Sequence, residues 1–388
     1  MYSRRVRSLS PSMTIAISTL ARELAAQGKD ILSFSMGEPD FDTPKAIKDE
    51  AIKALEAGFT KYTSVAGFPE LLKAVANKLK RDNNLEYDSG EILISNGAKH
   101  SLFNALQAIV DEGDEVIIPA PYWVTYPELV TYSGGKSVFV ETSEESGFKI
   151  TPKQLESALT PKSKVLILTT PSNPTGAVYS RNELERLAKV LRGSNIWVIS
   201  DEIYEKLVYE EEFTSAASIS EDMLKRTITV NGLSKSAAMT GWRMGYLAAK
   251  DRNLIKLMNN LQGQCTANIN SITQKASIPA LDGRIDKDVE MMRLEFMRRR
   301  DYAMSAINAI EGLSVMKPQG AFYLFVNIKS VMSDSMKFCQ ELLEEEGVAL
   351  VPGVGFGRDG YVRLSFATGM EKLQEGLKRL ERFCKSRA

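Results

Sequence analysis

The chain has 388 residues, of which 44% are hydrophobic and 25% are charged, and this composition is typical of a globular protein with one or two domains. Lysine plus arginine and aspartate plus glutamate both number 49, so the formal net charge of zero gives no general attraction to nucleic acid or to anionic membranes. We therefore expect neither nucleic acid nor a membrane as a partner.

Export and metal binding are also disfavoured by the sequence. The three cysteines are an odd number, lie far apart and form no C-x-x-C pair, which argues against a disulfide framework and against a zinc site. The twin arginine near the N-terminus is followed by Pro11, Arg22 and Glu23, which interrupt the apolar core that an export signal needs. No run of about 18 consecutive apolar residues is present, the rough minimum for a membrane-spanning helix. We expect a cytoplasmic protein without a metal.

The single histidine narrows the possible chemistry. A Ser-His-Asp or Cys-His arrangement would have to use His100, as would most zinc sites. This residue lies in "SNGAKHSLFNALQAIV", where the helical period favours a surface or packing role. Proton transfer is therefore expected from another residue type.

In chain order, a helix at 18–28 and a strand at 31–35 come first, and both could join a smaller module near the C-terminus. Short apolar runs then alternate with helical patterns such as 101–110 and 181–193. The predicted strands are 91–95, 114–119, 164–170, 196–200, 227–230 and 245–249. This alternation predicts an α/β fold with a parallel or mostly parallel sheet covered by helices.

The last quarter of the chain has a different pattern. A long amphipathic helix is predicted at 285–312 and leads out of the sheet region. Further strands at 320–328, 346–353 and 361–368 follow, together with a helix at 335–347. We interpret this region as a smaller α+β module.

The segments that directly follow the central strands are the candidate functional residues, because ligands of such sheets bind at the carboxyl ends of the strands. In the segment "NGLSK", Lys235 lies among small uncharged residues without an acidic neighbour within several positions, as an imine-forming amine requires. Arg243 lies eight residues further on and could clamp a phosphate. The alternative for this arginine is a surface ion pair.

Polar residues after the other strands suggest a shared ligand. Asp201 ends a buried strand, where a carboxylate needs a cationic partner such as a protonated ring nitrogen. The alternative is that Asp201 caps the start of a helix. Tyr204 would project nearby if "DEIYEKL" starts a helix. Asn173 in "PSNPTG" could donate to a ligand oxygen or belong to a plain turn. The "NGAKHS" segment offers backbone N–H groups at a helix start, which suits an anion or simple capping.

An imine-forming lysine, a carboxylate for a pyridine nitrogen and an anion site together fit one cofactor, pyridoxal 5'-phosphate. A glycine cluster at 352–360, "PGVGFGRDG", superficially suggests dinucleotide binding. Its spacing differs from the dinucleotide pattern, and a strand rather than a helix follows it. The sequence therefore favours pyridoxal phosphate over a nicotinamide cofactor.

Residues 232–245 resemble the cofactor attachment pattern of the class I pyridoxal-phosphate-dependent aminotransferases, roughly G-x-S-K followed by G-x-R-x-G. The segments "GEPDFDTP", "PYWVTYPE", "SNPTG", "SDEIY" and "VRLSFAT" are similar to the other landmarks of that family and occur in its order. The resemblance runs from about Ser8 to the C-terminus. It is strongest to the bacterial aspartate aminotransferases that carry a lysine after the "NGA" turn.

The resemblance implies a fold of pyridoxal-phosphate fold type I. Its large domain, residues 45–285, would contain a mostly parallel seven-stranded sheet covered by helices, and both termini, residues 1–44 and 286–388, would form a smaller α+β domain. The implied function is transfer of the amino group of L-aspartate to 2-oxoglutarate, giving oxaloacetate and L-glutamate, by a ping-pong mechanism. The implied assembly is a homodimer with shared active sites.

The resemblance also implies roles for individual residues. Lys235 would hold the cofactor as an internal aldimine and move the proton between the substrate and the cofactor, and Asp201 would keep the ring nitrogen protonated. The implied cofactor contacts are Gly97, Ala98, Lys99 and Arg243 at the phosphate end, Trp123 stacked on the ring, Asn173 and Tyr204 at the phenolic oxygen, and Tyr62 from the neighbouring subunit. These assignments make Lys235, Asp201 and Tyr204 the catalytic residues.

Substrate binding is implied at an overlapping set of residues. Arg363 would bind the alpha-carboxylate, with Gly37 lending its backbone at the mouth of the site and with Trp123 and Asn173 nearby. Lys99 would bind the distal carboxylate of a dicarboxylic substrate, because a second carboxylate in a closed pocket needs its own cation. The alternative is that Lys99 only balances the cofactor phosphate.

Two departures from the family pattern leave details open. Many relatives have a hydroxyl residue three positions before the lysine, where this chain has Gly232. Relatives that also accept prephenate can carry a basic residue near the N-terminal "SPS" motif, where this chain has Ser10. The alternatives are an aminotransferase of aromatic, alanine or prephenate specificity, or a pyridoxal-phosphate-dependent lyase. A non-enzymatic cofactor sensor is a further alternative, and it needs a DNA-binding module for which the sequence leaves no obvious room.

Overall fold

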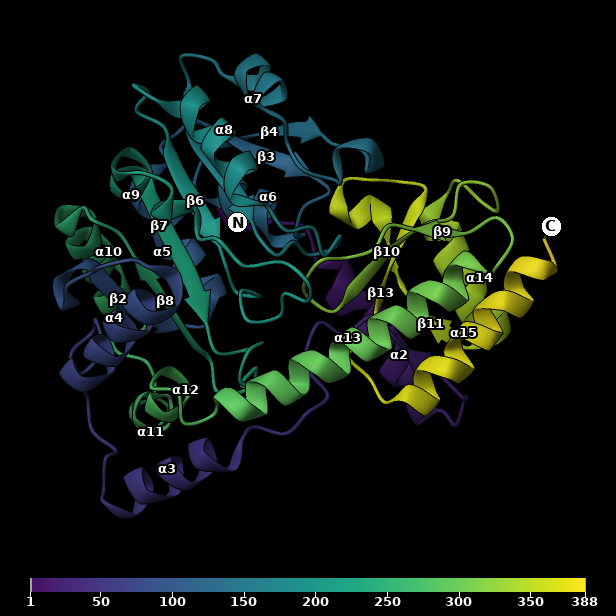
Figure 1. Ribbon diagram of the computed structural model, residues 1–388, viewed down its shortest axis with the longest axis horizontal. Coiled ribbons are helices and arrows are strands. Elements are labelled where there is room, and N and C mark those ends of the chain that lie inside the picture. Colours follow the sequence, from purple (N-terminus) through teal and green to yellow (C-terminus); the bar gives the residue numbers. More distant parts are fainter. Residues whose placement is uncertain (1, 388) are drawn as a thin grey trace.

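The computed structural model describes residues 2–387. Two groups of elements lie side by side, one built on a large sheet and one on smaller sheets, and the long helix α13 (Asp286–Asn308) runs from one to the other (Figure 1). The predicted helix at 285–312 is confirmed by α13.

The large sheet has seven strands in the order β2-β8-β7-β6-β5-β3-β4. All neighbouring pairs are parallel except those of β8, which runs antiparallel to β2 and β7. The strands are β2 (Ile92–Asn96), β3 (Glu115–Ala120), β4 (Lys136–Glu141), β5 (Ser163–Thr169), β6 (Trp197–Asp201), β7 (Thr227–Gly232) and β8 (Met244–Ala248). The predicted mostly parallel sheet is confirmed.

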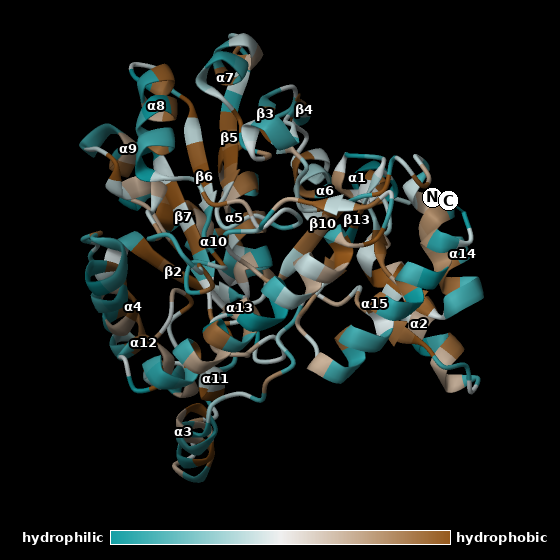
Figure 2. Ribbon diagram, turned by 45° about the vertical axis from the view of Figure 1, so that its right-hand side comes forward, coloured by the Kyte–Doolittle hydropathy of each residue, from teal (hydrophilic) through white to brown (hydrophobic). Residues whose placement is uncertain are grey.

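Alternating side chains of the central strands pack against helices on both faces of this sheet. Val165 and Ile167 of β5 pack in one cluster with α5 (Ala98–Ile109) and α10 (Arg252–Cys265), while Leu166 and Leu168 pack in another with α8 (Arg181–Leu191). A strand buried on both faces is apolar throughout, and Figure 2 shows hydrophobic colour along β5, β6 and β7. This is why the apolar runs were readable as strands.

Helix α8 illustrates how local sequence sets an element's ends. Its N-cap Ser180 accepts a hydrogen bond from the backbone N–H of Glu183, and the Glu183 side chain accepts one from the N–H of Ser180, which forms a capping box. Gly193 follows the helix with a φ of 77°, a conformation that favours glycine. The prediction of a helix at 181–193 is confirmed to within two residues at its C-terminal end.

The second group of elements contains a four-stranded antiparallel sheet and a two-stranded sheet. The four-stranded sheet has the order β12-β13-β10-β9, from β9 (Ser314–Val315), β10 (Tyr323–Asn327), β12 (Val351–Pro352) and β13 (Tyr361–Ser365). The two-stranded sheet pairs β1 (Leu32–Ser33) with β11 (Val348–Ala349) in parallel. The single strand predicted at 346–353 is therefore wrong, because the chain changes sheets between β11 and β12.

Helices from both ends of the chain cover these smaller sheets. They are α2 (Met13–Ala26), α14 (Ser335–Glu346) and α15 (Met370–Lys385). Helix α2 begins five residues before the predicted helix start at residue 18. Because β1 pairs with β11, the N-terminal segment packs with the C-terminal part of the chain.

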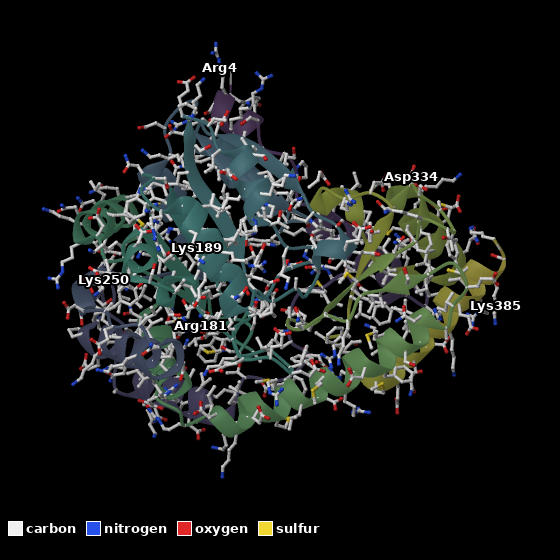
Figure 3. All side chains as sticks on the ribbon, turned by 45° about the horizontal axis from the view of Figure 1, so that its top comes forward. Arg4, Arg181, Lys189, Lys250, Asp334 and Lys385 are labelled. Carbon is white, nitrogen blue, oxygen red and sulfur yellow. The ribbon has the colours of Figure 1, made fainter. Side chains whose placement is uncertain are left out.

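The remaining helices are short or peripheral. The α-helices are α1 (Arg4–Arg7), α3 (Lys45–Glu56), α4 (Pro69–Asn83), α6 (Thr125–Tyr132), α7 (Pro152–Ala158), α9 (Glu221–Arg226), α11 (Ser271–Ala276) and α12 (Ile278–Leu281), and the 3-10 turns are Ser89–Glu91, Glu144–Ser146, Ala216–Ser218 and Gly353–Phe356. Charged side chains such as Arg4, Lys250 and Lys385 lie at the periphery (Figure 3). Within residues 2–387, none of the helices combines the length and the apolar character needed to cross a membrane.

Candidate active site

A cavity of about 400 Å³ lies at the carboxyl ends of the large sheet's parallel strands, where side chains from β10 and β13 also reach it. Ten of the predicted site residues line this cavity: Gly37, Ala98, Lys99, Trp123, Asn173, Asp201, Tyr204, Lys235, Arg243 and Arg363. Residues more than 300 positions apart in sequence are therefore brought together. Gly97 flanks the cavity at the start of α5, and Tyr62 lies away from it.

Lys235 follows β7 and projects into the cavity. Its removal from bulk water lowers the pKa of its amine from 10.5 to about 8, so a usable fraction is neutral near neutral pH. Its Nζ donates a hydrogen bond to the carbonyl oxygen of Gly37. The sequence showed no acidic neighbour, but the fold places Glu38 close enough to raise the pKa of Lys235 in opposition to burial. The Glu38 carboxylate accepts a hydrogen bond of 2.9 Å from Thr240.

Asp201 is the last residue of β6 and is buried. Burial raises the pKa of its carboxyl group from 3.8 to about 6, because a carboxylate loses its hydration there. The Tyr126 hydroxyl donates to Oδ2 over 2.8 Å, and the backbone N–H of Ile203 donates to Oδ1 over 3.3 Å. The helix considered at "DEIYEKL" is wrong, since these residues form a turn after β6. Tyr204 still reaches the cavity, with its hydroxyl 2.8 Å from that of Tyr323.

Arg363 is buried on β13 and is held in place from two sides. Its guanidinium donates to Asn173 Oδ1 over 2.9 Å and to the Ser35 carbonyl oxygen over 2.7 Å, and it lies 4.4 Å from the centre of the Tyr323 ring. Its Nε is buried without a hydrogen-bond partner among the residues described. A buried guanidinium with spare donors suits a ligand carboxylate. Because Asn173 Oδ1 is engaged, its amide N–H groups remain to donate.

Basic groups gather at the start of α5. Gly97 has a φ of 79°, and a Cβ at this position would collide with the guanidinium of Arg243. Arg243 donates to the backbone carbonyl oxygens of Thr240 and Asn96 over 3.0 and 3.4 Å, so its position does not depend on the surface ion pair considered as an alternative. The Lys99 amine lies 5.0 Å from the centre of the Trp123 ring. A helix start flanked by two cations is a suitable anion site.

The fold excludes a side chain at Gly232. A Cβ there would lie 2.8 Å from the carbonyl oxygen of Met244 and 3.0 Å from Gly245 Cα, both on β8. A hydroxyl residue could enter only if these backbones moved apart. Ser234, which sequence reasoning did not single out, lines the cavity and is the hydroxyl residue next to Lys235.

Comparison with known proteins decides the family. The family model described as "Aminotransferase class I and II" matches residues 29–380, which is most of the chain.

The protein belongs to this aminotransferase family. The predicted family is thereby confirmed, and the protein is an aminotransferase enzyme. Similar curated proteins include the aspartate aminotransferase of Bacillus sp. (strain YM-2), 46% identical over 391 residues with 99% of each chain covered. The aspartate/prephenate aminotransferase of Nitrosomonas europaea is 45% identical, with 97% of this chain and 98% of that protein covered.

Solved structures agree with this assignment. The aspartate aminotransferase of Rhizobium meliloti superimposes with a TM-score of 0.96 at 40% identity, and that of Thermus thermophilus with maleate does so with a TM-score of 0.95 at 43% identity. In both cases 99% of each chain is covered. The predicted fold type I is confirmed for this aminotransferase.

Several residues of the aminotransferase's cavity were not found from the sequence. Tyr126, Glu38, Thr240 and Arg22 all line it. Tyr126 carries a weak local signal, because it stands one helical turn after Trp123 in "PYWVTYPE". The other three have no distinguishing local pattern, and their position follows only from the tertiary fold.

Two further residues are placed by the structure outside the cavity. The side chain of Tyr62 is 90% exposed in the single chain, in a loop between α3 and α4. His100 packs within α5, where its Nδ1 accepts a hydrogen bond of 3.2 Å from the backbone N–H of Asn96 and its ring stacks on Phe103. The packing role expected for the histidine agrees with this position.

Proposed function

We propose that this aminotransferase binds pyridoxal 5'-phosphate at Lys235 and transfers the amino group of L-aspartate to 2-oxoglutarate in two half-reactions. The support for aspartate is one observation: the cavity holds a cation, Lys99, in addition to the arginine suited to an alpha-carboxylate, and no carboxylate of the described residues lies close enough to influence its pKa. A substrate with a second carboxylate would supply the missing partner.

The residues present fit the proposed cofactor. An aldehyde needs an amine that is partly neutral, which Lys235 supplies, and a ring nitrogen needs a buried acceptor, which Asp201 supplies. A phosphate fits the start of α5, because the lack of a side chain at Gly97 lets the Arg243 guanidinium lie directly against the first turn of that helix. The aromatic ring of Trp123, which lines the cavity, completes a site for a flat, anionic molecule.

When bound, pyridoxal phosphate supplies an aldehyde that takes up the amino group and a ring that accepts the electron pair released at the alpha carbon. The protein's own residues do the rest. Lys235 holds or releases a proton at Nζ, for which a pKa near 8 is well suited. Arg363 orients the substrate through its alpha-carboxylate, and Asp201 presents a negative charge towards the ring nitrogen.

The charge balance of the cavity supports a dicarboxylic substrate. Among residues 2–387, five cationic side chains line it, whereas only two carboxylates do: the cations are Arg22, Lys99, Lys235, Arg243 and Arg363, and the carboxylates are Glu38 and Asp201. This excess of positive charge matches a phosphate together with a doubly charged acid. The similar Thermus thermophilus enzyme was solved with maleate, which is a dicarboxylate.

We limit the proposal to the aspartate and 2-oxoglutarate pair. Some similar proteins are named aspartate/prephenate aminotransferases. Relatives that also accept prephenate can carry a basic residue near the "SPS" motif. Here Ser10 stands at that position, and its backbone N–H donates to the Glu128 carboxylate over 2.8 Å.

Replacement of Lys99 by alanine tests the substrate proposal. Loss of a charge-assisted bond to the distal carboxylate is expected to lower kcat/KM for aspartate by about 1.5–3 kcal/mol of transition-state stabilisation. Alanine and phenylalanine, which have no distal carboxylate, should be unaffected. The measurement is kcat/KM for these three amino acids with a common oxo acid.

The charge-conserving Lys99→Arg variant is the matched control, and it should keep most of the preference for aspartate. An equal loss for all three amino acids in Lys99→Ala, with weaker cofactor retention, would assign Lys99 to the phosphate alone. The substrate would then have to be sought among acids without a second carboxylate.

We also propose that the protein is a homodimer with shared active sites. The support is Tyr62, a large aromatic residue whose side chain is 90% exposed and does not line the cavity of its own chain. Aromatic residues left in water are typical of protein interfaces. In this arrangement Tyr62 contributes to the phosphate end of the partner's site.

Hybrid dimers test this arrangement. A Lys235→Ala chain and a Tyr62→Ala chain are each expected to be impaired alone, while their mixture should regain activity. One of the two sites in each hybrid dimer then contains both wild-type residues. Because half of the dimers in a random 1:1 mixture are hybrids, the mixture should recover roughly a quarter of wild-type activity. No recovery, or full activity of a monomer in sedimentation, would contradict the proposal.

We further propose that residues 45–285 act as the large domain and that 1–44 and 286–388 act together as the small one. Support comes from α13, which begins at Asp286, and from the pairing of β1 with β11. The cavity takes Asp201 and Lys235 from the proposed large domain and Arg363 from the small one. A relative movement of the two would therefore change the cavity's shape.

A further inference from the structure

Tyr126, on α6, lines the cavity and contacts Asp201. Its hydroxyl lies 2.8 Å from Asp201 Oδ2 and 2.7 Å from Thr169 Oγ1, at the end of β5. Its ring packs edge-on against Trp123, with 5.4 Å between the ring centres and an angle of 85°. Tyr126 thus contacts both the acid and the aromatic residue assigned above to the cofactor ring, and it is buried.

Proton counting fixes the direction of these hydrogen bonds. A tyrosine hydroxyl has one proton, and an ionised aspartate can only accept. Tyr126 therefore donates to Asp201, and Thr169 must be the donor in its bond to Tyr126. The chain of hydrogen bonds runs from Thr169 through Tyr126 to Asp201, and in this form it is complete only when Asp201 is charged.

We infer that Tyr126, supported by Thr169, is a positioning residue that keeps Asp201 ionised and turns its Oδ1 towards the ring nitrogen of the cofactor. The inference rests on the proposed binding of pyridoxal phosphate. The Tyr126 hydroxyl donates to Oδ2 and the Ile203 N–H donates to Oδ1, so the carboxylate cannot rotate without losing bonds. A neutral or rotated Asp201 would lose its charge pairing with a protonated ring nitrogen.

The electrostatics around Asp201 agree with this role. Burial raises its pKa to about 6, whereas the hydrogen bond from Tyr126, the Ile203 N–H and the charge of Lys235 all act to lower the pKa. Tyr204 is the other titratable group that senses Asp201, and it is neutral because burial raises its pKa well above 10.0. Removing the Tyr126 hydroxyl therefore shifts the pKa of Asp201 further up, towards the neutral range.

Cofactor binding by the cofactor-free Tyr126→Phe variant tests the inference. Two ligands are compared by equilibrium titration: pyridoxal phosphate and the analogue in which carbon replaces the ring nitrogen. The variant should bind pyridoxal phosphate about tenfold to a hundredfold more weakly than wild type, the usual effect of a hydrogen bond to a charged group. Binding of the carbon analogue should be unchanged or tighter, because this analogue has no ring nitrogen to pair with Asp201.

Tyr122→Phe is the matched control, since this neighbouring tyrosine stacks on Phe139 and does not contact Asp201. It should bind both ligands as wild type does. Thr169→Val should also weaken the binding of pyridoxal phosphate and not that of the carbon analogue, by a smaller factor than Tyr126→Phe. In the double variant it should add little to the effect of Tyr126→Phe, because both residues act through one chain of hydrogen bonds. If Tyr126→Phe does not fold, as judged by circular dichroism, the inference is tested by Thr169→Val, which should weaken the binding of pyridoxal phosphate and leave that of the carbon analogue unchanged.

An equal loss of affinity for both ligands in Tyr126→Phe would show that Tyr126 only packs against Trp123. Wild-type affinity of this variant for pyridoxal phosphate would show that the Tyr126 hydroxyl does not act on Asp201. Either result overturns the inference. Failure of the wild-type protein itself to bind pyridoxal phosphate is a separate result, because it would overturn the proposed function.

Discussion

Lys235→Ala is expected to lower the transamination rate by about 10⁴-fold or more, because it removes both the covalent attachment point and the group that moves the proton. The purified variant should also lack the visible absorption band that the wild type shows with its cofactor. In the wild type, borohydride should abolish that band and leave a label on Lys235, detectable by mass spectrometry of peptides.

The pH dependence of cofactor uptake gives an independent check on the same residue. The neutral amine is the reactive form, and burial lowers the pKa of Lys235 to about 8. The rate of band formation on mixing cofactor-free protein with pyridoxal phosphate should therefore rise with pH and level off above about pH 8, rather than continue towards 10.5. Lys225→Ala, at an exposed lysine on α9, is the control and should leave activity unchanged. Full activity of Lys235→Ala would contradict the role assigned to it.

Arg363→Ala has the second largest expected effect, and unlike the change at Lys99 it should affect every amino acid. Leaving a substrate carboxylate unpaired in a buried site costs about 3–5 kcal/mol, which corresponds to roughly 10²–10⁴-fold in kcat/KM. Aspartate, alanine and phenylalanine all carry the alpha-carboxylate, so their losses should agree within about tenfold.

Arg363→Lys separates charge from geometry. The lysine keeps the positive charge but cannot donate to Asn173, to the Ser35 carbonyl and to a substrate with the same planar fork. Arg363→Lys should therefore recover only part of the kcat/KM that Arg363→Ala loses. A variant at an exposed arginine, Arg382→Ala, should behave as wild type. If Arg363→Ala lowered kcat/KM for aspartate alone, the assignments of Arg363 and Lys99 would have to be exchanged.

The central sheet was predictable because its strands are short apolar runs buried on both faces, but β4 was missed when the residues alone were read. Only the resemblance implied a seventh strand. Strand β4 lies at the edge of the sheet, and the sequence "KSVFVE" has just three apolar residues, half-exposed in the fold. The predicted strand at 346–353 failed for another reason. Apart from Glu346 its residues are uniformly apolar, so no local signal shows that the chain changes sheets at Leu350.

The site was predictable where a strand end carries its functional side chain, as at Asp201 and Lys235, because the carboxyl ends of parallel strands meet at one edge. The contacts that tune these residues were not predictable. Glu38 acts on Lys235 across nearly 200 positions of sequence, and Tyr126 donates to Asp201 across 75. Such pairs depend on how helices and loops pack over the sheet, and a single sequence does not record that.

The first half-reaction alone distinguishes transamination of aspartate from the alternatives. The cofactor-loaded protein is mixed with L-aspartate in the absence of any oxo acid, and absorbance, oxaloacetate and ammonia are measured. We expect that the visible aldehyde band disappears, that one oxaloacetate forms per site without ammonia, and that 2-oxoglutarate then restores the band and yields L-glutamate. Release of ammonia, or a band that survives saturating aspartate, would rule out the proposed aspartate transamination.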